Sequence, residues 1–188
     1  MTDRDGWNER HAASAGREPG APSAWVIAHA PLLPRGALVL DIAAGRGRHA
    51  LALAALGHSV LALDASEPAM GELGRRDARV MATVGDAGAL PVRDGAFDAV
   101  VCVNFLDRSL FPHAARLLRQ GGLLIAETFT IAQRVLGRGP RADAHLLGPG
   151  ELRDLTAHLR ILDYYEGPIH DDAGERFVAA VVARAGAG

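Results

Sequence analysis

The sequence has very little of several residue types, and each shortage excludes a class of protein. Cys102 is the single cysteine among 188 residues, so disulfides within the chain do not stabilise this fold. Lysine is absent, and the 20 basic residues, all arginine, are balanced by 22 acidic ones without forming a basic stripe. Nucleic acid is therefore not an expected partner. No apolar stretch approaches the uninterrupted length that spans a membrane, so a membrane partner is not expected either.

What the chain does contain suits one α/β core. Hydrophobic residues make up 49% of the sequence, which is enough for one good core at this length but not for two. We therefore expect a single domain over residues 1–188, with residues 1–30 as a lid or N-terminal extension. The polar opening lacks a secretion-signal pattern, so we expect a cytoplasmic protein.

Apolar stretches separated by turn residues predict seven strands. They are expected near 37–41, 59–63, 80–83, 99–103, 123–127, 160–165 and 177–184. The first strands alternate with helical stretches, a pattern typical of a doubly wound, parallel sheet with helices on both faces. The connection over 167–174 is too short for a helical crossover, so the last two strands should pair antiparallel. The predicted fold is a Rossmann-like α/β fold with a mostly parallel seven-stranded sheet and an antiparallel C-terminal hairpin.

The most informative segment runs from Val39 to Asp64. It contains an apolar strand, an acid at Asp41, a glycine loop, an Ala/Leu helix and a second strand that ends in another acid. The loop glycines, Gly45 and Gly47, lack a Cβ, which lets the backbone turn sharply and approach a ligand closely. Asp64 lies 19 residues after Gly45, where a carboxylate can accept both hydroxyl protons of an unphosphorylated ribose.

Asp41 decides between two cofactors that use such a loop. Residues 45–50 also fit the G-x-G-x-x-G/A pattern of nicotinamide-dependent enzymes. A pyrophosphate on the loop would be repelled by the carboxylate of Asp41, whereas the ammonium of an amino-acid moiety would be attracted to it. The sequence therefore predicts S-adenosylmethionine, with its zwitterionic end near Asp41.

This segment resembles the first motif of the class I S-adenosylmethionine-dependent methyltransferases. It departs from that motif at Ala43, where the family usually has an earlier glycine. The resemblance implies cofactor contacts from Ala43 and from Ala65, the neighbour of Asp64. It continues at Asp86 and Ala87, which match the positions where the family holds the adenine amino group and the adenine ring.

The acceptor is expected beyond the fourth and fifth strands, because ligands of open α/β sheets lie at the carboxyl ends of the strands. Residues 104–111 and 127–130 resemble a branch of small bacterial methyltransferases that includes relatives of the tellurite-resistance enzymes. Residues 7–10, with the sequence Trp-Asn-Glu-Arg, resemble the opening of the same branch. Openings of that kind often fold over the cofactor.

Three residues on this side are predicted to be catalytic. Asn104 would orient the methionine end of the cofactor or the acceptor, and Arg108 would supply positive charge for an anionic acceptor. Alternatively, Arg108 is solvated while Asp107 caps the helix that we expect to run to Gln120. Glu127 ends a buried strand, where an unpaired carboxylate is costly, so it either contacts the substrate or pairs with a nearby arginine.

The histidines suggest no metal site, because none of their spacings converges on a metal. His49 is expected either to face the cofactor or to lie on the helix surface. A soft anionic acceptor, such as a thiolate or a tellurium or selenium oxyanion, needs no general base, and Arg10 or Arg108 would steer it. An oxygen or nitrogen acceptor would need proton removal by Glu127 or His145.

The predicted function is S-adenosylmethionine-dependent transfer of a methyl group to a small-molecule acceptor, with a soft anionic nucleophile as the candidate. A cofactor-binding regulatory or partner subunit without turnover is the alternative from another class. A nicotinamide-dependent oxidoreductase is the third. The sequence does not indicate an oligomeric state.

Overall fold

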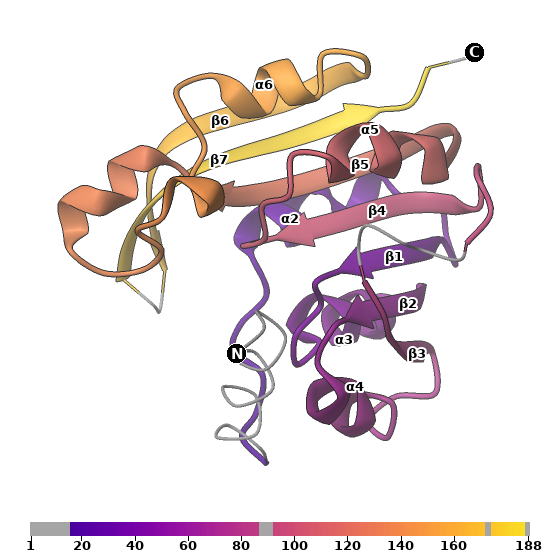
Figure 1. The fold of residues 1–188 in the computed structure, drawn as a ribbon. Coiled ribbons are helices and arrows are strands. Elements are labelled where there is room, and N and C mark those ends of the chain that lie inside the picture. Colours follow the sequence, from indigo (N-terminus) through magenta and orange to yellow (C-terminus); the bar gives the residue numbers. More distant parts are fainter. Residues whose placement is uncertain (1–15, 87–91, 172–173, 187–188) are drawn as a thin grey trace.

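The computed structural model describes residues 16–86, 92–171 and 174–186. In these residues seven strands form one mixed sheet in the order β3-β2-β1-β4-β5-β7-β6 (Figure 1). Only the pairs of β7 with β5 and with β6 are antiparallel. The predicted fold class is confirmed. The strands are β1 (Leu38–Ile42), β2 (Ser59–Asp64), β3 (Val80–Val84), β4 (Phe97–Val103), β5 (Leu118–Phe129), β6 (Arg160–Asp171) and β7 (Gly174–Arg184).

Helices cover both faces of this sheet, as Figure 1 shows. Helices α2, α3 and α4 pack on one face, and α5 and α6 pack on the other. Short 3-10 helices η1, η2 and η3 lie in the connections. The bounds are α2 (Ala24–His29), α3 (Arg48–Ala55), α4 (Glu67–Leu73), α5 (Leu110–Leu117), α6 (Glu151–Leu155), η1 (Ala30–Leu32), η2 (Ile131–Leu136) and η3 (Asp143–His145). None of the helices in the described ranges has the length and apolar character of a membrane span.

Strand alternation builds a separate apolar core on each face, because successive side chains point to opposite sides of a sheet. In β1, Val39 packs with α2, α3 and α4, whereas Leu40 and Ile42 pack with α5 and α6. In β5, Ile125 belongs to the first core and Leu124 to the second. The side chains of odd-numbered residues near the carboxyl ends of β1 and β5 therefore lie on the face of the sheet that α2 and α3 cover.

Two local predictions were wrong in their extent. The connection predicted over residues 167–174 is mostly strand, because β6 and β7 stay paired from Arg160 to Asp171, which is opposite Gly174. Helix α5 ends at Leu117, before Gln120, because the chain turns at once into β5.

The start of α5 also differs from the predicted cap. Ser109 is the N-cap residue, although its side chain makes no capping hydrogen bond. Asp107 instead accepts the Ser109 amide at 2.9 Å, which fixes the turn before the helix. The predicted N-cap at Asp107 was therefore wrong, although this residue still organises the helix start.

Candidate active site

The glycine loop between β1 and α3 is tied to the end of β2 by Asp64. The Gly45 N–H donates to Oδ2 of Asp64 at 2.7 Å, and the Ser66 N–H donates to Oδ1 at 2.8 Å. A carboxylate has about four lone-pair positions, so these two amides leave acceptor capacity on both oxygens. Asp64 therefore holds the loop in place and still has lone pairs that could accept the hydroxyl groups of a ribose.

The loop contains a backbone conformation that its own sequence does not favour. Ala43 has φ of +55°, and a left-handed conformation disfavours residues with a Cβ. This is the position where the predicted motif usually has a glycine. Gly47, with φ of +80°, needs its missing Cβ for a second reason, because that atom would lie 2.3 Å from Cδ1 of Leu73. Gly47 thus allows α4 to pack against the loop.

Asp41, at the end of β1, is the most unusual charged group of this edge. It is 1% exposed, and neither carboxylate oxygen has a hydrogen-bond partner among the described residues. Burial raises the pKa of Asp41 to about 7, against the opposing effects of the Ala50 amide and Arg48. Because an unpaired buried carboxylate is costly, this side chain fits a site that receives a cation.

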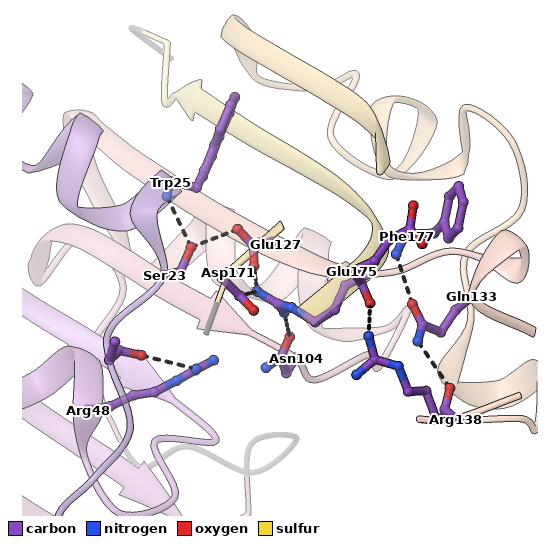
Figure 2. Close-up of polar contacts among 12 residues, drawn as sticks. Ser23, Trp25, Arg48, Asn104, Glu127, Gln133, Arg138, Asp171, Glu175 and Phe177 are labelled. Atoms are coloured by element: carbon purple, nitrogen blue, oxygen red, sulfur yellow. Dashed lines mark hydrogen bonds and ion pairs between the residues drawn. The ribbon is translucent and has the colours of Figure 1, made fainter. Parts of the chain in front are cut away.

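A polar cluster surrounds Glu127 at the end of β5 (Figure 2). The Ser23 hydroxyl donates to Oε2 of Glu127 at 2.7 Å, and Nη2 of Arg176 lies 3.5 Å from Oε1. Arg176 also donates to Oδ1 of Asn104 at 3.3 Å and pairs with Asp171. Of the two roles predicted for Glu127, pairing with an arginine is therefore present in the structure.

Asn104 is held to the same cluster by its backbone. Its N–H donates to the carbonyl of Glu127 at 2.8 Å, and its φ is +59°. Asparagine is among the residues that tolerate this conformation best. The structure thus brings Asn104 and Glu127, two of the three predicted catalytic residues, next to each other.

Arg108, the third predicted catalytic residue, makes a different set of contacts. Its Nε and Nη2 donate to Glu151 at 2.5 and 3.0 Å. Further bonds reach the carbonyls of Leu146 at 3.0 Å and Ala144 at 3.4 Å. Arg108 therefore fastens the segment before α6 to the loop after β4, and its role toward an acceptor stays a prediction.

The predicted adenine side lies at the end of β3. The Gly85 N–H donates to the Asp64 carbonyl at 3.0 Å, which places exposed Asp86 one residue beyond this contact. Ala65 is half-buried directly after Asp64. Ala87 lies outside the described residues, as do residues 7–10. Their roles stay predictions.

The described part of the predicted N-terminal extension contacts both the glycine loop region and the polar cluster around Glu127. Arg46, in the glycine loop, donates to the carbonyl of Arg17, and Arg48 donates to that of Ala21 at 3.3 Å. Ser23, which bonds Glu127, also accepts the Trp25 amide at 3.1 Å and so caps α2. The assignment of residues 1–30 as a lid stays a prediction.

Sequence patterns alone did not identify three further residues of this edge, namely Ser23, Arg48 and Arg176. Arg176 carried a signal, because the period-two pattern of β7 places it on the same face as Val178, Ala180 and Val182. It is 7% exposed, and an arginine at such a position predicts a buried partner. Arg48 directly follows Gly47, at the first residue of α3.

Other reactive residue types do not form a second centre in the part of the chain that the structure describes. Within the described ranges, no group of His, Cys, Asp and Glu side chains is arranged to hold a metal ion. Burial raises the pKa of Cys102 to about 12, so its thiol is inert at neutral pH. His49 is 3% exposed, and burial lowers its pKa to about 3. A place on the helix surface was therefore wrong for His49.

Known proteins share both the sequence of the loop and the fold. Residues 39–122 match the family model described as methyltransferase domain. These residues belong to a methyltransferase domain. The match confirms the predicted methyltransferase family for residues 39–122.

A demethylmenaquinone methyltransferase of Clavibacter sepedonicus is 34% identical over 139 residues, which are 69% of this chain and 56% of that protein. The chain spans about half the length of the curated relatives it matches. TehB from Haemophilus influenzae, a tellurite-resistance methyltransferase, has a TM-score of 0.73 at 21% identity, covering 91% of this chain and 65% of TehB.

A structure described as conversion of a disulfide bond into a thioacetal group during echinomycin biosynthesis has a TM-score of 0.77. It is 21% identical and covers 98% of this chain and 93% of the other. At such identities these two structures establish the shared fold.

Proposed function

We propose that this protein transfers a methyl group from S-adenosylmethionine to a small-molecule acceptor. The observation that carries the proposal is Asp41, a fully buried carboxylate without a hydrogen-bond partner in the described residues. It precedes the glycine loop, and Asp64 at the end of the neighbouring strand β2 accepts a hydrogen bond from Gly45 of that loop. A ligand with an ammonium group and a ribose would engage both carboxylates at once.

Each cofactor-binding residue has a separate task in this proposal. Asp41 holds the ammonium of the methionine end, and Asp64 accepts the ribose hydroxyls. Asp86 and Ala87 hold the adenine, while Ala43 and Ala65 form the floor beside them. The bound sulfonium supplies an electrophilic methyl group, so the chain's main work is to align an acceptor and to exclude water.

The acceptor that best fits the site is one that is already anionic, such as a thiolate or a chalcogen oxyanion. Oε2 of Glu127 accepts a hydrogen bond from Ser23, and Oε1 lies 3.5 Å from Arg176 without a hydrogen-bond partner among the described residues. His145 is exposed in η3. Glu127 is paired with Arg176 and His145 is exposed, and an anionic acceptor needs no general base.

Two structural neighbours point to sulfur or chalcogen chemistry, whereas the curated relatives point elsewhere. The echinomycin-related structure concerns a disulfide and a thioacetal, and TehB is a tellurite-resistance methyltransferase. The curated relatives act, by their names, on demethylmenaquinone or at the N-terminus of cypemycin. We propose a soft anionic acceptor over a quinone, and a cytoplasmic location without nucleic-acid or membrane partners.

Turnover must be tested directly, because a shared fold does not guarantee a shared reaction. One structural neighbour, with a TM-score of 0.70, is named a [4+2]-cyclase. The test is the release of S-adenosylhomocysteine in the presence of thiols, tellurite, selenite, small amines or a demethylated quinol. We expect release with a thiol or a chalcogen oxyanion. Binding of S-adenosylhomocysteine without release for any acceptor would favour a non-catalytic partner subunit instead.

A further inference from the structure

The guanidinium group of Arg48 has few binding partners in the structure. Within the described part of the chain, its guanidinium makes one long hydrogen bond, from Nη1 to the Ala21 carbonyl at 3.3 Å, and no ion pair. Figure 2 shows this side chain extending toward the group of polar residues at the carboxyl edge. A guanidinium has five N–H donors and stays charged in proteins, so most of its binding capacity is unused.

The surroundings of Arg48 favour an added anion. Burial and the charge of Arg176 both lower the pKa of Arg48, whereas Glu127, Asp41 and Asp171 oppose this effect. Arg176 already pairs with Glu127 and with Asp171. The guanidinium groups of Arg48 and Arg176 are thus close enough to repel each other. Of the three acids that act on Arg48, two already pair with Arg176.

The position of Arg48 relative to Asp41 indicates which anion this is. Asp41 precedes the glycine loop and Arg48 follows it, as the first residue of α3. Their charges act on each other, yet they form no ion pair. An α-amino acid presents an ammonium and a carboxylate on one carbon atom, and these two side chains match that pair of charges.

We propose that Arg48 binds the carboxylate at the methionine end of the cofactor, while Asp41 binds its ammonium. This inference rests on the proposed function. The planar fork of arginine suits a carboxylate through two parallel hydrogen bonds. The start of a helix adds a favourable dipole for an anion. An acceptor would instead meet Asn104 and Glu127, beyond β4 and β5.

The experiment pairs one substitution with two ligands in titration calorimetry. S-adenosylhomocysteine carries the carboxylate, and its decarboxylated analogue keeps the adenosine, the thioether and the amine. The variant Arg48→Gln is expected to bind S-adenosylhomocysteine about 10- to 100-fold more weakly, the loss of a charge-assisted bidentate contact. Its affinity for the decarboxylated analogue should change less than about twofold, because the deleted contact is absent there.

Arg46→Gln is the matched control from the same loop. Arg46 donates to Glu72 at 3.0 Å and to the carbonyl of Arg17, so its loss should affect both ligands by the same factor. Arg48→Lys, which keeps the charge but not the fork, should lie between Arg48→Gln and wild type for S-adenosylhomocysteine alone. It also serves if Arg48→Gln does not fold.

Two results would overturn the assignment of Arg48. The first is an unchanged affinity of the Arg48 variants for S-adenosylhomocysteine. The second is an equal loss for both ligands, which would give Arg48 a structural role in the loop. Failure of the wild-type protein to bind S-adenosylhomocysteine would overturn the proposed function, and this inference with it.

Discussion

Burial of Asp41 predicts that the ligand-free protein loses stability as the pH rises from about 4 to about 7. The folded state keeps a proton on Asp41 up to a pKa of about 7, whereas the unfolded chain releases it near the ordinary aspartate pKa of 3.8. In that interval the folded state binds more protons than the unfolded state, so stability falls with rising pH. Below the unfolded pKa the effect is absent, and above the folded pKa it is constant.

The size of the effect follows from the pKa difference. The interval from 3.8 to about 7 is about 3 pH units, and each unit corresponds to about 1.4 kcal/mol. The full contribution is therefore about 4 kcal/mol, a large part of the 5–15 kcal/mol, roughly, that stabilises a typical protein. Asp41→Asn removes the titration while keeping the shape of the side chain.

The assay is urea unfolding of wild type and Asp41→Asn at several pH values from about 4 to about 8. The stability of the variant relative to wild type should increase across this range and level off above about pH 7, by up to about 4 kcal/mol. Asp94→Asn is the control, since Asp94 is an exposed partner of Arg116. A constant difference for Asp41→Asn, or one that shrinks with rising pH, would refute the reasoning.

Three further predictions concern the loop and the helix that follows it. Ala43→Gly should stabilise the protein by about 1 kcal/mol in thermal unfolding, because it relieves a left-handed φ; a loss would count against strain at this position. Gly47→Ala should destabilise it by about 1–3 kcal/mol through the clash with Leu73, and a melting temperature like that of wild type would be inconsistent with this packing. Because the pKa of His49 is lowered from 6.5 to about 3, wild type should lose stability relative to His49→Gln as the pH falls below 6.5, by about 3 kcal/mol near pH 4.5. Parallel acid unfolding curves would contradict it.

Local patterns were sufficient to predict the fold and where Asp41, Gly45 and Asp64 lie in it. Asp41 and Asp64 end strands that are adjacent in the sheet, and Gly45 lies in the loop between them. All three follow from apolar stretches, glycine positions and the parallel order of the strands. The position of Ala43 was also predicted, although its positive φ was not.

The network around Glu127 depends on contacts between distant parts of the chain. Ser23 lies 104 residues before Glu127 and Arg176 lies 72 residues after Asn104, so no local spacing connects these side chains. Arg108 illustrates the same difficulty, because its partner Glu151 lies 43 residues further along. The packing of α2, β5 and β7 decides which arginine pairs with which acid. Of these features, only the burial of Arg176 could be predicted from the sequence pattern.

We propose above all that the edge formed by Asp41, the glycine loop and Asp64 binds S-adenosylmethionine. Titration calorimetry of the wild-type protein with S-adenosylhomocysteine and, separately, with NAD tests it most directly, with Asp64→Ala as the companion variant. We predict saturable binding of S-adenosylhomocysteine, none of NAD, and a weaker affinity in a folded Asp64→Ala protein. Preferential binding of NAD, or an unchanged dissociation constant for Asp64→Ala, would contradict it.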